Sequence, residues 1–171
     1  SSRRRHTRYG TVTGVQTCAP SDLLFKVLTS SGISLQHEIE MLHLARELGL
    51  VSVALAFDLE DSVEIVSQAR PDIFCFHAGT TKGGLTGYDS GETIEQTARR
   101  TDEVYRAVRD IAPDTILIAH GAALETPEDG RYMLNHTSGH GFWTGSSTER
   151  IPIEKAVFET ASEFASLRFE E

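Results

Sequence analysis

The segment PDTILIAHGAALETPED, residues 113–129, indicates how the whole chain folds. Residues 115–119 within it are mostly apolar and partly β-branched, without an alternation of polar and apolar positions. Such a run is typical of a strand that is buried on both faces. The strand gives way to His120 and Gly121, and residues 126–129 then supply a proline and two acids, which are the signals of a helix start. We therefore expect His120 at the carboxyl end of a buried strand.

The same pattern occurs earlier in the chain, in PDIFCFHAG, residues 71–79, where His77 follows the apolar run. Periodicity and turn residues predict two further strands, with helices between all of them. The strands are expected at residues 51–57, 73–76, 115–119 and 141–144, and the helices at 34–48, 59–69, 93–111, 127–135 and 152–167. The sequence thus predicts an α/β protein of (β/α) repeats, with parallel strands joined by right-handed crossovers.

Four such units are half of the eight in a TIM barrel, a fold that usually takes about 250 residues. Two architectures remain open at this point, a small open α/β sheet and the C-terminal half of a barrel whose front half is absent. The unusual composition of the N-terminal segment favours the second architecture.

Residues 1–23 differ in charge from the rest of the chain, because they hold four of its 16 basic residues and one of its 25 acids. They have no helical or strand period and lack the apolar stretch of a signal peptide. A transit peptide and a basic arm are both compatible with this composition. However, SSRRRHTRY followed by TGVQTCA is similar to translated sequencing-adapter read-through. We therefore expect residues 1–23 to be a non-native disordered segment, and residues 24–171 to be a partial TIM-barrel domain.

The composition excludes several classes of function. A formal net charge of -9 argues against a nucleic-acid partner, which would need a basic face. No apolar run approaches the roughly 20 residues of a membrane span. Two cysteines, Cys18 and Cys75, provide no disulfide framework, and Cys75 lies within a predicted strand as a small apolar residue. A cytoplasmic protein without membrane or nucleic-acid partners is expected.

The carboxyl ends of the predicted strands are the expected site, because ligands bind at this rim in parallel α/β folds. His77 and His120 follow two of the strands, and imidazole titrates near neutrality, so the pair is suited to acid–base chemistry. The alternative is that each histidine only orders its own loop through backbone hydrogen bonds.

Two loops near this rim are candidates for anion binding. In the first, glycine amides, hydroxyls and an ammonium group can surround an anion, although a plain flexible loop fits equally well. Its candidate residues are Gly79, Thr80, Thr81, Gly83 and Gly84. The second loop opens the last helix, where barrels often hold phosphate. Its candidate residues are Gly145, Ser146, Ser147, Glu149 and Arg150, although Glu149 and Arg150 also suit a structural ion pair.

Three stretches resemble the phosphoenolpyruvate hydrolase-like TIM-barrel family, which is also described as an indole-glycerol-phosphate-synthase-like barrel. They are HAGTTKGGLTG (77–87), ILIAHGAALETPEDGRYML (116–134) and HGFWTGSSTERIPIEKA (140–156). The C-terminal domain of a plant antiviral resistance protein is among the members of this family. The resemblance implies that the four strands are strands five to eight of the barrel. One departure is Ala122, after Gly121, where the family usually has a second glycine.

The resemblance also implies a phosphoenolpyruvate- or pyruvate-type enzyme, a hydrolase or lyase, acting on a small phosphorylated or carboxylate substrate. In that reading His77, His120 and Glu125 are the catalytic residues, and Gly121 joins the two loops in binding the substrate. The metal site is unknown, with Mg²⁺ as a candidate, and the chain itself is expected to be an inactive, self-associating fragment. The alternative is a non-catalytic barrel that senses a ligand or binds a protein.

Overall fold

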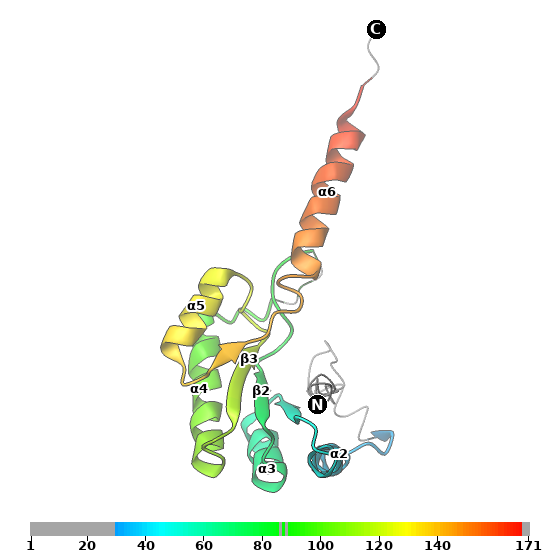
Figure 1. Cartoon of the computed structure of the whole chain (residues 1–171). Coiled ribbons are helices and arrows are strands. Elements are labelled where there is room, and N and C mark those ends of the chain that lie inside the picture. Colours follow the sequence, from blue (N-terminus) through cyan, green and yellow to red (C-terminus); the bar gives the residue numbers. More distant parts are fainter. Residues whose placement is uncertain (1–29, 86, 88, 169–171) are drawn as a thin grey trace, which may run out of the picture.

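The computed structural model describes residues 30–85, 87 and 89–168 of the chain. Within them, four strands alternate with helices (Figure 1). The predicted α/β fold of repeated βα units, resembling half of a TIM barrel, is confirmed. The numbering of its strands as five to eight stays a prediction, and the expectation for residues 1–23 lies outside the described residues. The elements are α2 (Leu35–Glu47), β1 (Val53–Ala56), α3 (Leu59–Ala69), β2 (Ile73–His77), α4 (Ile94–Ile111), β3 (Ile116–His120), α5 (Pro127–His136), β4 (Gly141–Phe142) and α6 (Arg150–Ser166).

The four strands form one parallel sheet in the order β1-β2-β3-β4, so each strand lies beside the next one along the chain. The crossovers contain α3, α4 and α5. In the pairing of β2 with β3, Phe74 lies beside Leu117 and His77 lies beside His120. The two PD-strand-His segments of the sequence are therefore neighbours in the sheet and in the same register.

The Pro71–Asp72 pair joins the amino ends of β1, β2 and β3. Asp72 accepts hydrogen bonds from the Ser52 amide (2.7 Å) and the Ser52 hydroxyl (2.8 Å), just before β1. Thr115, just before β3, donates its hydroxyl to the Pro71 carbonyl (2.9 Å). Ser52 and Thr115 are buried, whereas Asp72 is exposed. β2 and β4 begin at the predicted residues, and β1 and β3 begin two residues and one residue later than predicted.

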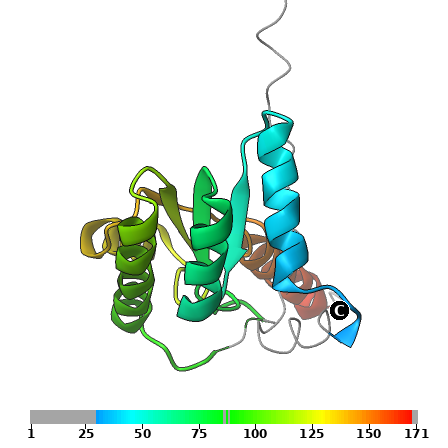
Figure 2. The same cartoon turned by 90° about the horizontal axis from the view of Figure 1, so that it is seen from below.

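One face of the sheet is covered by helices, because α2, α3, α4 and α5 follow one another along it (Figure 2). Phe74, Phe76 and Leu117 point into this layer, and the large side chain packed among them is Tyr105 of α4. All four are at most 1% exposed. The helix-covered face therefore contains the main hydrophobic core.

The other face of the sheet is formed by the alternate strand residues, since successive side chains point to opposite faces. It includes Leu55, Ile73 and Ile118, which are half-buried, and Ile116, which is 46% exposed. These four side chains belong to neither hydrophobic core cluster that the described helices form with the sheet. In a closed barrel this face would be the interior, and we refer to it as the open face.

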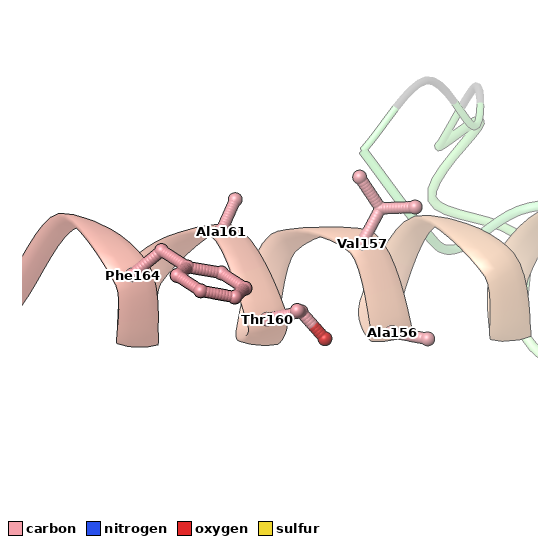
Figure 3. A pocket seen from close by; sticks show the side chains of 5 residues that line it. All are labelled: Ala156, Val157, Thr160, Ala161 and Phe164. Atoms are coloured by element: carbon pink, nitrogen blue, oxygen red, sulfur yellow. The ribbon is translucent and has the colours of Figure 1, made fainter.

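Helix α6 projects away from the sheet (Figure 1). Its apolar side chains Val157, Phe158 and Phe164 are more than 60% exposed. A shallow apolar surface runs along the helix, lined by Ala156, Val157, Thr160, Ala161 and Phe164 (Figure 3). Only the first turn is packed, with Ile151 buried. None of the described helices is long and apolar enough to cross a membrane.

Candidate functional site

The two histidines that follow β2 and β3 are in contact. His77 and His120 are 3% and 4% exposed, and their ring centroids are 4.7 Å apart in an edge-to-face arrangement. Phe57, just after β1, lies on the other side of His77 with a centroid distance of 4.9 Å. The parallel register places both imidazoles at the carboxyl edge of the sheet, as the sequence predicted.

Hydrogen bonds assign different roles to the two rings. The Gly79 amide donates to Nδ1 of His77 (3.3 Å), so this nitrogen is an acceptor and the proton of the neutral ring is on Nε2. Nδ1 of His120 lies 3.2 Å from the Trp143 carbonyl oxygen. A carbonyl can only accept, so Nδ1 of His120 is the donor, and Nε2 of its neutral ring has a free lone pair.

The pKa of His77 is lowered from 6.5 to about 4. Burial is the main cause, because it disfavours the charged imidazolium, and the neighbouring His120 adds to the shift. His77 is therefore neutral at neutral pH. It can donate a hydrogen bond through Nε2, but it does not supply a positive charge to a substrate.

The loops that leave β2 and β3 continue the ladder beyond the strands. Ala78 donates its amide to the His120 carbonyl (2.9 Å), and Ala122 donates its amide to the Gly79 carbonyl (2.8 Å). Gly121 has a φ of +81°, and a Cβ atom there would lie 2.0 Å from the Gly79 oxygen. The close approach of these two loops therefore requires glycine at position 121.

Ala122 adopts the left-handed conformation, with a φ of +51°, although it is not a glycine. It is buried, and its carbonyl accepts the Lys82 amide (2.9 Å). The backbone geometry that a second glycine would suit is thus kept with an alanine, at a cost of about 1–2 kcal/mol. The departure from the family pattern adds a methyl group without opening the loop.

The glycine-rich loop turns back on itself and reaches the first turn of α6. Gly83 and Gly84 have φ values of +83° and +70°, and Thr81 is buried. Arg150 donates to the carbonyls of Gly83 (3.0 Å) and Thr81 (3.3 Å). Arg150 also forms an ion pair with Glu154 (3.1 Å) rather than with Glu149. The loop and α6 are therefore held together by Arg150.

The turn that precedes α6 lies directly beside His120. A Cβ atom at Gly145 would be 3.4 Å from Cε1 of His120, and the Ser147 hydroxyl donates to the Leu124 carbonyl (3.0 Å). Among the residues that the structure describes, the amides of Gly145, Ser146 and Ser147 donate to no protein acceptor. They are the available anion-binding donors next to the histidine pair.

Glu125 lies elsewhere, against the glycine-rich loop. Its Oε2 would be 2.1 Å from a Cβ atom at Gly83, and its amide donates to Asp129 (3.2 Å). No hydrogen bond joins Glu125 to either histidine in the described part of the chain. Its catalytic role stays a prediction.

The described residues offer no cluster of side chains that would hold a metal ion through three or more protein ligands. Magnesium prefers several oxygen ligands in octahedral geometry. No group of three or more histidine, cysteine, aspartate or glutamate side chains is placed to hold a metal ion in the part of the chain that the structure describes. Asp58, at the end of β1, caps α3 by accepting the Asp61 amide (2.8 Å).

Sequence reasoning missed two residues that shape the site. Arg100 of α4 donates to the Ala78 carbonyl (2.5 Å) and to Glu92, and its guanidinium lies 5.5 Å from the centre of the Phe76 ring. Glu154 of α6 accepts the amide of Leu85 in the glycine-rich loop (2.6 Å). The spacing of four residues between Arg150 and Glu154 indicates an ion pair on a helix. The contact of Glu154 with Leu85, 69 residues earlier in the chain, leaves no signal in the sequence.

The family of the chain follows from comparison with known proteins. The family described as phosphoenolpyruvate hydrolase-like matches residues 17–167, which include both histidines, both candidate loops and α6. The chain belongs to the phosphoenolpyruvate hydrolase-like family. The resemblance noted in the sequence is thereby confirmed for nearly all of the described residues of this family member.

Two curated relatives come from Solanum lycopersicum, the ToMV resistance protein Tm-1(GCR237) and the ToMV susceptible protein tm-1(GCR26). Each is 32% identical over 144 residues, which are 84% of this chain and 19% of the relative. The chain thus spans about a fifth of the length of these relatives. Both relatives match this chain to the same extent.

Among solved structures, the chain is similar to the YdjI aldolase from Escherichia coli K12. The TM-score is 0.43 with 16% sequence identity, over 79% of this chain and 45% of that chain. This likeness is too distant to assign a reaction to the family member described here.

Proposed function

We propose that the carboxyl edge of the sheet binds a small phosphorylated or carboxylate substrate of the phosphoenolpyruvate or pyruvate type. The observation on which this rests is the buried contact between His77 and His120 beside the turn at Gly145, whose following amides are available as donors. Two polar rings and a set of backbone donors in one place suit a ligand with an anionic group and an adjacent carbonyl or enol oxygen.

In this proposal the two histidines have complementary tasks. His120 has the free lone pair on Nε2 and takes up a proton. In a hydrolase the proton comes from the water that bonds to phosphorus while the bond from phosphorus to the enol oxygen breaks and the enol of pyruvate leaves. In a lyase the proton comes from a substrate hydroxyl, which becomes a carbonyl while the neighbouring C–C bond breaks and its electron pair passes to the pyruvate enolate. His77 stays neutral and donates its Nε2 proton in a hydrogen bond to the enol or carbonyl oxygen. The amides of Gly145, Ser146 and Ser147 bind the anionic group. Both reaction types pass through an enol-like species, so the histidine pair does not choose between hydrolase and lyase.

The sequence-predicted residues enter the proposal with different weights. Gly121 and Gly79 bring the two strand-exit loops into contact, and Thr80, Thr81, Gly83 and Gly84 form the loop that covers Arg150. Glu125 is a second carboxylate at the edge of this loop, and Glu149 is exposed at the start of α6. We also propose that the whole protein turns over its substrate, that it is cytoplasmic and that the chain self-associates.

The test is calorimetric titration of phosphoenolpyruvate and pyruvate into the chain and into His120→Gln. His120 orders the turn whose amides bind the anionic group, because its Nδ1 donates to the Trp143 carbonyl. Loss of one amide hydrogen bond to a charged group is worth about 1.5–3 kcal/mol, so binding should weaken by roughly tenfold or more. His136→Gln is the matched control, because His136 is exposed on α5 and bonds only within its own helix, to the Tyr132 carbonyl. Equal affinity in all three proteins would show that the ligand does not bind at the histidine pair.

A non-catalytic binding role is the second candidate. It is favoured by the exposed apolar side chains of α6, since contiguous apolar surface often marks a protein contact. The curated relatives are named for virus resistance and susceptibility rather than for a reaction, which is in keeping with this role. Binding of phosphoenolpyruvate that depends on His120 would favour the enzyme-type site instead.

A further inference from the structure

One carboxylate in the structure is held as a bound ligand would be held. Oε2 of Glu154 accepts the Leu85 amide at 2.6 Å and lies 3.1 Å from Nη1 of Arg150. Arg150 in turn donates to the carbonyls of Thr81 and Gly83. The glycine-rich loop and the first turns of α6 are far apart in the sequence but lie side by side (Figure 1). They thus meet at the carboxylate of Glu154.

The groups around this carboxylate are those that proteins use for free anions. A guanidinium and a backbone N–H together form charge-assisted hydrogen bonds to carboxylates and phosphates. The loop approaches with bare backbone, because a Cβ atom at Gly84 would lie 2.2 Å from Oε2 of Glu154. The Glu154 side chain is 17% exposed, so solvent reaches the place that it occupies.

We propose that Arg150 and the Leu85 amide form an anion subsite, and that Glu154 occupies it as an internal carboxylate until a ligand phosphate or carboxylate displaces it. The ligand identity, a small acid with two anionic groups, rests on the proposed function. Its first anionic group would bind the turn at 145–147 and its second would bind this subsite. The turn at 145–147 comes just before α6, and Arg150, the first residue of α6, donates to the Gly83 carbonyl of the glycine-rich loop.

The opposite interpretation is that Arg150 and Glu154 are a permanent clamp that only shapes the loop. The two interpretations predict opposite changes in anion affinity when the Glu154 carboxylate is removed. If Glu154 competes with the ligand, its removal must strengthen anion binding, because a tethered carboxylate acts at an effective concentration in the millimolar range or above. If Glu154 only holds the loop, its removal must weaken anion binding or leave it unchanged.

The experiment is titration of inorganic phosphate into the full chain and its variants, followed by calorimetry and by the amide NMR shift of Leu85. Glu154→Ala is expected to bind phosphate about tenfold more tightly than the wild type, with the Leu85 amide responding. Glu154→Gln, which keeps a hydrogen-bond acceptor for Leu85 but no charge, is expected to gain less. Adding Arg150→Ala to Glu154→Ala should abolish the gain.

Glu159→Ala is the matched control, since Glu159 is an exposed acid on the same helix and its removal changes the net charge equally. It should leave phosphate binding unchanged. A gain in Glu159→Ala equal to that in Glu154→Ala would mean general electrostatics and would overturn the subsite. Glu154→Gln preserves the loop contact, so the absence of a gain in both Glu154 variants would overturn it as well.

The failure of this subsite and the failure of the proposed function are distinguishable. A phosphate gain in Glu154→Ala that persists when His120→Gln is added supports the subsite even if the histidine pair binds nothing. Phosphoenolpyruvate binding that requires His120, without any gain in the Glu154 variants, supports the proposed function and overturns the subsite.

Discussion

Phe74 and Ile116 lie on neighbouring strands of one sheet, yet their environments are opposite. Phe74 points to the helix-covered face and is 0% exposed, whereas Ile116 belongs to the open face and is 46% exposed. Both are large apolar residues in strands with similar sequence patterns. The difference shows that the open face is buried less completely than the helix-covered face, although Val53 and Cys75 on the open face are also buried. The stability of this unit therefore resides mainly in the helix-covered face.

The largest expected effect comes from removing a side chain from the helix-covered face. Phe74→Ala should lower the free energy of unfolding by about 3–5 kcal/mol, because it leaves a cavity among fully buried neighbours. Ile116→Ala should lower it by less than about 1 kcal/mol, because a half-exposed side chain loses little burial. Urea unfolding of both variants measures the difference. Equal losses would show that the open face is covered in solution.

The sheet itself was predictable from the sequence, since the two PD-strand-His segments placed His77 and His120 at equivalent strand ends. Local signals also located the helices, because Thr93 and Thr126 begin α4 and α5 as N-caps. The openness of one face was not readable in the apolar runs. A strand that would line a barrel interior has the same composition as one buried between layers.

The second effect compares how a residue on the open face and a residue in the helix layer change stability with pH. His77 continues the open-face row of β2, and Glu38 is on α2 in the helix layer. The pKa of His77 falls from 6.5 to about 4 on folding, mainly through burial. The pKa of Glu38 rises from 4.5 to about 7, also mainly through burial, although a hydrogen bond to the Leu55 backbone opposes this rise.

These shifts act on stability in opposite directions. Between pH 4 and 6.5 the unfolded chain binds the His77 proton more readily, so the His77 contribution is present above pH 6.5 and lost on acidification, by about 3 kcal/mol. Folded Glu38 retains its proton between pH 4.5 and 7, so its contribution is present below pH 4.5 and lost as pH rises, by a similar amount of about 3 kcal/mol.

We therefore expect a nearly flat stability profile for the wild type and opposite slopes for the two variants. Glu38→Gln should become more stable from pH 4.5 to 6.5, and His77→Gln should become less stable over the same range. Urea unfolding at half-unit pH steps measures both slopes. Slopes of the same sign in the two variants would contradict the assigned shifts.

The third effect concerns the open face and the two outer strands, β1 and β4, which pair on one side only among the described residues. Such edges and an uncovered apolar face favour association between copies. We expect the chain to self-associate, and Ile116→Lys to weaken the association by about tenfold, since burying an unpaired charge is costly. Sedimentation velocity over a concentration series measures this.

Glu128→Lys adds the same positive charge at an exposed position of α5 and is the control for that experiment. It should leave the association unchanged. A monodisperse monomer that unfolds cooperatively at high concentration would contradict the half-barrel reading and favour a complete small α/β domain.

The residues of the candidate site were predictable in kind but not in their partners. The histidines and the glycines stand at strand ends, where a sequence pattern can place them. Arg150 was expected to hold an external anion, whereas its donors go to Thr81, Gly83 and Glu154. These contacts depend on where a long loop returns in space, and no local periodicity records that path.

The smallest effect is expected at Ala122, in the loop that follows β3 at the carboxyl edge of the sheet. Its φ of +51° strains an alanine by about 1–2 kcal/mol. Ala122→Gly relieves this strain but loses a buried methyl group and gains unfolded-state freedom, each worth roughly 0.5–1 kcal/mol. The net change should be within about 0.5 kcal/mol of zero.

Ala123→Gly is the matched control, because Ala123 is buried without a positive φ. It loses the methyl group and gains unfolded-state freedom, but it relieves no strain. It should therefore be the less stable variant by about 1–2 kcal/mol in urea unfolding, and equal losses in both would mean that Ala122 is not strained.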